Sequence, residues 1–306
     1  MAPSSATAPT PPAGPPGRKE TAAPPGGPRN SGGDRFDAPL NPAGRGKLTA
    51  EDLHKAFGDK KVLDGVSFTV AEGESLAIVG PSGTGKSVLL KHLIGLLQPD
   101  SGRVLVDDTD VWSLDAFERN TLRRKFGMSF QEGALFDSMT VYENVAFPLR
   151  RSRTPATRVR QRVRECLDTV HLEGIESRYP SELSGGMRRR VGFARAIAHE
   201  PEILLFDEPN TGLDPIMTDI IDEVILEMRE KTRATIVTIT HHIPSAQKIG
   251  DRIALLFGGK ILYAAPPDEF VRSKDPAVRQ FVDGRADGPL TDGTVEARRR
   301  ISEGGA

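Results

Sequence analysis

The segment GPSGTGKS, Gly80 to Ser87, decides the fold of this chain. It follows the apolar run SLAIV (75–79), which has the length of a strand. It precedes VLLKHLIGLL (88–97), in which apolar residues recur at helical spacing. A strand, a glycine-rich loop and a helix in this order form the context in which the pattern G-x-x-x-x-G-K-S/T binds phosphate. The segment therefore predicts a phosphate-binding loop at the carboxyl end of a strand.

The residue types of this loop suit a nucleoside triphosphate held together with Mg²⁺. Its glycines allow successive backbone N–H groups to point inward, and a helix that begins near Gly85 adds the positive end of its dipole. We expect Lys86 to reach the β- and γ-phosphates and the Ser87 hydroxyl to bind Mg²⁺. The predicted nucleotide-binding residues of this segment are Gly80, Pro81, Ser82, Gly83, Thr84, Gly85, Lys86, Ser87 and Val88.

The composition narrows the class of protein. The chain has 306 residues, of which 37% are hydrophobic, enough for one or two domains. A formal net charge of −1 gives no general basic field, so we expect no nucleic-acid partner. The single cysteine, Cys166, excludes an internal disulfide framework and fits a reducing compartment. No run approaches the ~18 apolar residues of a membrane span, and the N-terminus lacks an apolar signal region. We expect a cytoplasmic protein unless a partner holds it at a membrane.

Three parts of the chain differ in composition. Residues 1–46 are mostly Pro, Gly, Ala and Ser, so they cannot bury enough apolar surface to offset their ordering entropy. We predict a disordered tail there, with a docking segment for a partner as the alternative. Residues 47–285 are predicted to fold as one domain, and residues 286–306 as a C-terminal tail.

Within the folded domain, strands alternate with helices, which predicts an α/β fold with a mainly parallel core sheet. Two strand-like runs flanking the turn 58–61 predict an antiparallel part before the phosphate loop. Residues 132–190 have a different pattern, with helices expected at 155–170 and from Gly185 to His199, and predict an inserted helical subdomain.

The run ILLFDE, Ile203 to Glu208, reads as a buried strand that ends in two carboxylates. We expect Asp207 to hold Mg²⁺ together with Ser87, and Glu208 to polarise the attacking water. An ordinary strand with an acidic end is a credible reading of this run alone, and it carries little weight beside a phosphate loop.

A second glycine segment, LSGGM, spans Leu183 to Met187 and opens a predicted helix. The Ser184 hydroxyl and the N–H groups of Gly185 and Gly186 can form another anion-binding cradle at a helix N-terminus. One nucleotide needs only one phosphate loop. The second cradle therefore suggests that it serves the nucleotide of another chain.

With these motifs in order, the chain resembles the nucleotide-binding subunits of ABC transporters over roughly residues 47–283. Gln131 matches the glutamine of the Q-loop, NTGLDP (210–215) the D-loop, and His241 the switch histidine. The resemblance implies a P-loop ABC ATPase fold that binds ATP and Mg²⁺ and works as a homodimer, with each ATP held between the phosphate loop of one subunit and the signature of the other. It also implies that Phe57 stacks on adenine, unless Phe57 is a core residue. The residues implied for catalysis are Lys86, Gln131, Glu208 and His241. Those implied for Mg²⁺ are Ser87, Gln131 and Asp207.

Three positions depart from the pattern of that family. Met187 replaces the usual glutamine of the signature, but the cradle is formed by Ser184 and glycine amides, so we expect ATPase activity to persist. His242 stands where an acidic residue is common. Because neighbours on a strand face opposite sides, only one of the two histidines can face the nucleotide, and we choose His241. In the D-loop, Gly212 occupies a position that is often held by Ala, which is a mild change.

A finer resemblance concerns transport. QEGALFDSMTVYENVAFPLR (131–150) and PSELSGGMRRR are similar to the ATPases of the Mla phospholipid-trafficking system and its Mce-associated relatives. This resemblance implies an integral membrane permease, an MCE-domain protein and a small regulatory subunit as partners, at the cytoplasmic face of the bacterial inner membrane. The tail VRQFVDGRADGPL (278–290) either contacts the neighbouring ATPase subunit, as in that group, or is a solvated helix. The expected permease contact lies in residues 131–148, with an apolar patch of four side chains: Ala134, Leu135, Phe136 and Val141.

Three other functions are compatible with some of these motifs. The ATPase of another importer, for amino acids or ions, would share every catalytic motif. A soluble ABC protein of DNA repair or translation would carry two cassettes or a long coiled-coil insertion. The interval from Gln131 to Ser184 is only 53 residues and has no sustained heptads, which weighs against that class. A catalytically inactive scaffold would lack Lys86, Asp207 or Glu208, and all three are present.

Overall fold

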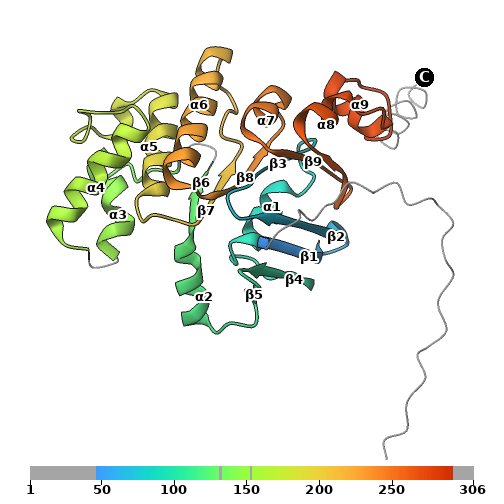
Figure 1. Ribbon diagram of the computed structural model, residues 1–306, viewed down its shortest axis with the longest axis horizontal. Helices are drawn as coiled ribbons and strands as arrows, with labels where there is room; N and C mark the ends of the chain where they lie inside the picture. Colours follow the sequence, from blue (N-terminus) through green and yellow to red (C-terminus); the bar gives the residue numbers. More distant parts are fainter. Residues whose placement is uncertain (1–45, 131–132, 152–153, 292–306) are drawn as a thin grey trace, which may run out of the picture. The chain divides into compact units, whose positions relative to one another are not determined.

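Two β-sheets organise the computed structural model, which describes residues 46–130, 133–151 and 154–291 (Figure 1). The predicted N-terminal tail lies outside these residues except for its last position, and Gln131 and Glu132 lie outside them as well. None of the described helices is long and apolar enough to cross a membrane.

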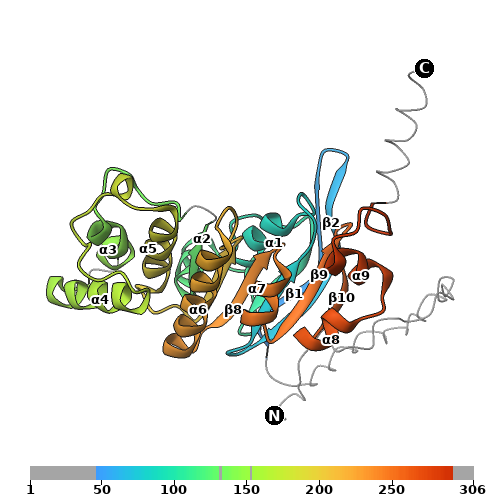
Figure 2. The same cartoon turned by 90° about the horizontal axis from the view of Figure 1, so that it is seen from above.

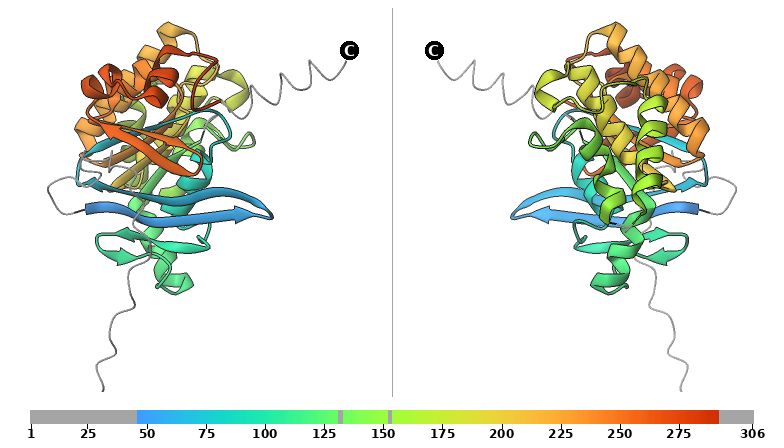
Figure 3. Two further views of the ribbon diagram at one scale, coloured as in Figure 1. Left: turned by 90° about the vertical axis from the view of Figure 1, so that its right-hand side faces the viewer. Right: turned by 90° about the vertical axis from the view of Figure 1, so that its left-hand side faces the viewer.

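The first sheet is antiparallel and contains the longest strands, two of 12 residues that are drawn in blue in Figure 3. A turn at positions 58–59 joins them, where Gly58 adopts a φ of 57°, and Phe57 pairs with Lys60 across it. This sheet confirms the antiparallel N-terminal part. Its strand order is β2 (Lys60–Ala71), β1 (Gly46–Phe57), β4 (Ser101–Val106) and β5 (Thr109–Asp110).

The second sheet is parallel except for its last strand, β10, as the α/β prediction required. Its order is β10 (Lys260–Ala265), β9 (Arg252–Phe257), β3 (Ser75–Val79), β8 (Thr235–Thr240), β7 (Ile203–Asp207) and β6 (Phe126–Ser129). Val79 pairs with Thr240, and Asp207 pairs with Ile239. Strands β3, β7 and β8 therefore end at the same edge, where the loops that follow them meet.

Alternation along β3 connects two cores. Leu76 and Ile78 pack in one apolar cluster with residues of α1 (Lys86–Leu93), whereas Ala77 and Val79 pack in another with residues of α7 (Ile243–Ile249). All five residues of β3 are buried, as is typical of a parallel strand covered on both faces. Helix α6 (Pro215–Thr232) buries one face in the cluster that continues into the helical insertion.

The helical insertion contains one helix more than the sequence pattern predicted. The expected helices are α4 (Ala156–Thr169) and α5 (Gly185–Ile197). The additional helix, α3 (Val141–Arg151), contains Pro148, a residue that is unfavourable in helix interiors and obscured the pattern. Figures 1 and 2 show these three helices together at one end of the core sheet. A short helix outside this insertion, α2 (Ala116–Leu122), begins at a capping box formed by Asp115 and Glu118.

The buried face of α3 corrects one sequence expectation. Val141, Val145 and Leu149 follow each other at intervals of four residues and are buried in the helical core. Val141 therefore does not contribute to a surface patch with Ala134, Leu135 and Phe136, because its side chain points into the subdomain.

The C-terminal segment packs on the sheet and is not a solvated helix. It comprises α8 (Pro267–Arg272), α9 (Pro276–Asp283) and the residues that follow to Thr291. Val278 is completely buried, and both Val278 and Leu290 belong to the same cluster as Val79 of β3. The buried Gln280 accepts a hydrogen bond from the Leu290 N–H (2.7 Å) and donates one to Thr291 Oγ1 (2.8 Å). Packed structure therefore continues beyond position 285.

This packing yields a prediction for two truncations. Removing residues 278–306 should destabilise the domain, because it takes Val278 and Leu290 out of the core at about 1.5–3 kcal/mol each. Differential scanning fluorimetry should show a melting temperature lower by on the order of 10 °C. Removing only residues 292–306 keeps all of these contacts and should lower the melting temperature less than the longer truncation does. Equal melting temperatures for the two truncations would contradict the assigned packing.

Candidate functional site

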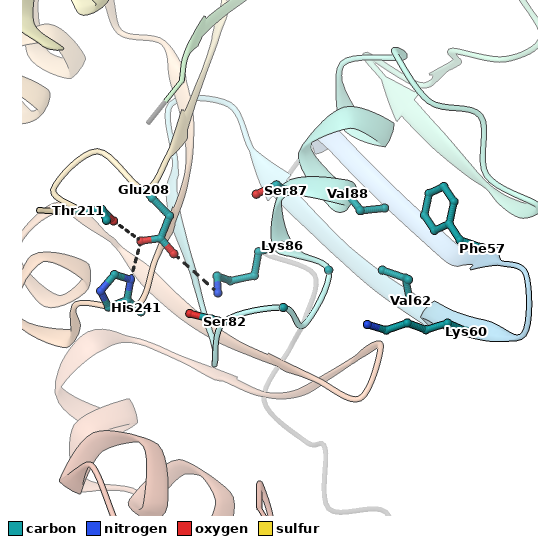
Figure 4. Close-up of a pocket in the computed structure, with 12 residues that line it drawn as sticks. Phe57, Lys60, Val62, Ser82, Lys86, Ser87, Val88, Glu208, Thr211 and His241 are labelled. Atoms are coloured by element: carbon teal, nitrogen blue, oxygen red, sulfur yellow. Dashed lines mark hydrogen bonds and ion pairs between the residues drawn. The ribbon is translucent and has the colours of Figure 1, made fainter. Parts of the chain in front are cut away.

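The carboxyl edge of the parallel sheet carries a pocket of about 490 Å³ (Figure 4). The phosphate-loop segment forms its floor. One wall comes from β1 and β2 and the other from the loops after β7 and β8. Twelve residues line it: Phe57, Lys60, Val62, Ser82, Gly83, Gly85, Lys86, Ser87, Val88, Glu208, Thr211 and His241.

The phosphate loop requires glycine at its last turn. Gly85 caps α1 with a φ of 94°, in the left-handed region, and a Cβ atom there would lie 2.7 Å from Val62 Cγ1. Because this close turn ends directly at the first residue of α1, the free N–H groups of that helix open onto the pocket. The first turn of α1 contains no acidic residue. The local chain therefore favours an anion at this position.

Lys86 is almost completely buried at the start of α1. Its Nζ donates hydrogen bonds to the carbonyl oxygens of Gly80 (2.8 Å) and Pro81 (2.9 Å) and lies 3.7 Å from Glu208 Oε1. Burial lowers the pKa of Lys86, and the carboxylates of Glu208 and Asp207 oppose that shift. Thr84 Oγ1 donates to the same Pro81 carbonyl (2.9 Å), a contact within the loop itself. Of the predicted loop residues, Gly80, Pro81 and Thr84 are not among those lining the pocket.

Ser87 and Asp207 meet where α1 approaches the end of β7. Ser87 Oγ donates a hydrogen bond to Asp207 Oδ1 at 3.1 Å. Burial raises the pKa of Asp207, the hydrogen bond from Ser87 opposes that shift, and the neighbouring Glu208 carboxylate adds to it. A hydroxyl and a carboxylate oxygen fit Mg²⁺, which is commonly held by one or two protein ligands and by substrate phosphates. The described residues contain no cluster of three or more His, Cys, Asp and Glu that could hold a metal by themselves.

Glu208 is fixed by its backbone and by its carboxylate. It has a φ of 51°, which is uncommon for a residue with a side chain, and its N–H donates to the Ile239 carbonyl at 2.8 Å. Its Oε2 atom accepts a hydrogen bond from Thr211 Oγ1 (3.1 Å) and lies 2.7 Å from His241 Nδ1. These contacts hold the carboxylate at the pocket wall opposite Phe57 (Figure 4).

The two adjacent histidines have separate positions, but for a reason that differs from the one predicted. Strand β8 ends at Thr240, so strand alternation does not apply to His241 and His242. His241 turns toward Glu208, whereas His242 caps α7 and places its Nδ1 atom 2.8 Å from Ser245 Oγ. The structure therefore brings His241, and not His242, into the pocket.

Phe57 lies at the opposite wall, at the end of β1. Its side chain is 51% exposed, so it is not a core residue, and Val62 of β2 lines the same wall. Lys60, Val62 and Thr211 also line the pocket, and no sequence motif predicted them there. The alternation of Lys60 and Val62 along β2 was the available signal, because residues two apart on a strand face the same side.

The LSGGM segment is not part of this pocket. Ser184 caps α5, and its Oγ accepts a hydrogen bond from the Met187 N–H at 3.2 Å. Gly185 lines a different hollow, together with Arg188 and residues of the D-loop. The Met187 side chain is partly buried and packs against the helical core. Within one chain, the structure brings together the predicted phosphate-loop, Asp207, Glu208, His241 and Phe57 positions, but not the second cradle.

Comparisons with known proteins agree with this geometry. The family model for "ABC transporter" matches residues 63–211. The "Probable ribonucleotide transport ATP-binding protein mkl" of Mycobacterium tuberculosis is 43% identical over 244 residues, which cover 79% of this chain and 68% of that protein. The "Intermembrane phospholipid transport system ATP-binding protein MlaF" of Escherichia coli is 40% identical over 240 residues, with coverages of 78% and 89%. The dimeric structure of the ATP-binding cassette MJ0796 in a post-hydrolysis state, bound to ADP and Pi, gives a TM-score of 0.65 at 32% identity, covering 72% of this chain and 98% of that one.

Proposed function

The chain belongs to the ABC transporter family of ATP-binding subunits, and from this we propose that it hydrolyses ATP to drive a membrane permease that moves phospholipid or a similar hydrophobic molecule. The observation that carries the hydrolytic part is the position of Glu208. Its carboxylate is held by Thr211 and His241 on the wall of the phosphate-loop pocket, 3.7 Å from the Lys86 ammonium.

The residues of the pocket support a division of roles. We propose that Lys86 binds the terminal phosphates. Its ammonium would then replace two hydrogen bonds to neutral carbonyl groups with contacts to an anion. Ser87 and Asp207 would hold Mg²⁺, which when bound screens the negative charge of the phosphate oxygens. Glu208 would orient and polarise the attacking water, and His241 would keep its carboxylate in place. Gln131, which we also assign to catalysis and the metal, lies outside the described residues.

We propose that Ser184, Gly185 and Gly186 complete the site of a second chain. Two observations support this: the three residues lie outside the pocket of their own chain, and the similar MJ0796 cassette is dimeric. In such a homodimer, each ATP would lie between the phosphate loop of one chain and the signature of the other. Phe57, half-exposed at the pocket rim, would stack on the adenine.

The transported molecule is inferred from sequence similarity alone, because the ATPase site does not contact it. MlaF is named for phospholipid transport, and mkl for ribonucleotide transport. We favour phospholipid because residues 131–150 and 278–290 resemble the Mla and Mce-associated group and because the match covers 89% of MlaF. An importer of ribonucleotides, amino acids or ions is the alternative.

A permease would dock on the hollow beside α3. Phe136 and Phe147 pack there in a tilted arrangement, with ring centroids 4.8 Å apart, and the Arg195 guanidinium lies 5.8 Å from the Phe136 ring centroid. Phe130 and Pro148 line the same hollow. Such docking would place the chain at the cytoplasmic face of a bacterial inner membrane. An MCE-domain protein and a small regulatory subunit are further proposed partners, by similarity to the Mla system.

The two cradles can be separated by mutation. Lys86→Ala should weaken ATP binding by about 10- to 100-fold, because a charge-assisted interaction with phosphate is lost. Ser184→Arg should leave ATP binding to a single chain unchanged and abolish hydrolysis, since the larger cation obstructs the pairing of two chains. Filter binding of labelled ATP and a phosphate-release assay measure both. An equal loss of binding in the two variants would contradict the proposed second cradle.

Glu208→Gln tests the proposed catalytic residue. Glutamine keeps the size of Glu208 but cannot accept a proton from water, so hydrolysis should fall by about 100-fold or more. ATP should still bind, and two chains should remain closed over two ATP molecules. Size-exclusion chromatography with and without Mg-ATP should reveal an ATP-dependent dimer. Near-normal phosphate release would remove Glu208 from catalysis, and a loss of ATP binding would make its role structural.

The substrate proposal calls for a transport measurement. The chain, purified with its permease and reconstituted in vesicles, should move a fluorescent phospholipid in an ATP-dependent manner, and the Glu208→Gln complex should not. The same vesicles offered labelled ribonucleotide should show no uptake. ATP-dependent ribonucleotide uptake without phospholipid movement would refute the lipid assignment while leaving the ATPase assignment intact.

A further inference from the structure

A carboxylate is buried behind the pocket wall, at a position that the proposed mechanism does not use. Asp222 lies on α6 and is 3% exposed. Its Oδ1 atom accepts a hydrogen bond from Asn210 Nδ2 (2.8 Å), and its Oδ2 atom accepts one from Ser245 Oγ (2.7 Å). Asn210 Nδ2 also donates to Ser245 Oγ (2.8 Å), so the three side chains form a closed triangle. We call these three residues the Asp222 network.

Burial of this carboxylate is unfavourable, which points to a role other than packing. Burial raises the pKa of Asp222, while the hydrogen bonds from Ser245 and Asn210 oppose that shift. Both hydrogen-bonding partners are neutral side chains. An apolar residue would fill the same space on α6 without the desolvation cost of a carboxylate. A connected set of buried hydrogen bonds does, however, fix the relative positions of the segments that it joins.

One arm of the network leads to the catalytic carboxylate through the D-loop. Asn210 precedes Thr211, whose Oγ1 donates to Glu208 Oε2 at 3.1 Å. Arg189 of α5 donates hydrogen bonds to the carbonyl oxygens of Pro209 and Thr211, on either side of Asn210. Helix α6 therefore holds the Asn210 side chain, and helix α5 holds the backbone on either side of Asn210.

The other arm leads to the same carboxylate oxygen through the loop after β8. Ser245 Oγ lies 2.8 Å from His242 Nδ1, and the His242 N–H donates to Thr240 Oγ1 at 3.0 Å. His242 adjoins His241, whose Nδ1 lies 2.7 Å from Glu208 Oε2. Both arms thus start at Asp222 and end on one atom, Glu208 Oε2.

We infer that Asp222 is a positioning residue for hydrolysis: through Asn210 and Ser245 it holds the D-loop and the His241 loop so that Thr211 and His241 both remain on Glu208 Oε2. Asp222 is not among the residues that line the pocket, and its hydrogen bonds in the described residues go to Asn210 and Ser245, not to the phosphate loop or Phe57. Its loss therefore changes turnover and not nucleotide binding. The inference rests on the proposed role of Glu208.

The test compares two aspartates on the same helix. Asn at position 222 keeps the size of Asp but turns an NH₂ donor toward either the Asn210 amide or the Ser245 hydroxyl. Asp222→Asn should lower kcat by about 10- to 100-fold, the effect expected when catalytic groups shift by a fraction of an ångström to one ångström. The KM for ATP and the binding of labelled ATP should stay within about twofold of wild type, since the phosphate contacts remain.

Asp219→Asn is the matched control. Asp219 also joins α6 to α7, through Lys248 Nζ at 2.5 Å, but it is exposed and lies outside the network. Its kcat and KM should equal those of wild type. An equal fall in kcat for Asp219→Asn and Asp222→Asn, or an unchanged kcat for folded Asp222→Asn, would overturn the inference.

Ser245→Ala tests the same network from the other side. It should lower kcat without raising KM. The Asp222→Asn/Ser245→Ala double variant should lose no more activity than the more affected single variant, because either substitution alone already disrupts the network. Additive losses overturn the inference. If neither single variant shows a wild-type-like melting curve, the network is structural and the inference also fails. Glu208→Gln, assayed in parallel, must be inactive. If it hydrolyses ATP, the proposed function fails and not merely the role of Asp222.

Discussion

The site depends on the register of three parallel strands. Because β3, β7 and β8 pair side by side and end together, the chain segments that leave them converge at one edge of the sheet. The phosphate loop follows β3, Glu208 follows β7, and His241 follows β8. A one-residue shift of any of these strands would reverse which side chains face each core, so the apolar clusters on both faces fix the register and with it the site.

Burial gives the pocket its electrostatic character. Lys86, Asp207 and Glu208 are brought together where water is partly excluded, so each charge is more sensitive to its neighbours than it would be at the surface. Glu208 is further held by a left-handed backbone and by two side chains. The same loops that hold Glu208 are themselves held by a carboxylate on α6. Position and charge at this site are thus set by contacts that extend well beyond the residues lining the pocket.

Motifs with short spacing were predictable from sequence, and contacts between distant residues were not. The strand–loop–helix pattern around Lys86 and the strand ending at Asp207 indicated the fold and the family, because each is local and tied to one chemistry. The Asp222 network was not predicted, since its bonds join residues 12, 23 and 35 positions apart and involve types common on surfaces. Helix α3 was not predicted, because Pro148 is unfavourable in a helix interior. In the structure, the burial of Val145 and its neighbours outweighs this unfavourable propensity.

The central claim is that a working site combines the phosphate loop of one chain with the Ser184 cradle of another. The most direct measurement is a crystal structure of the Glu208→Gln variant with Mg-ATP. We expect each triphosphate to contact Lys86 of one chain and the Ser184 hydroxyl and Gly186 N–H of its partner. A triphosphate contacted by a single chain, with Ser184 remote from any nucleotide, would contradict it.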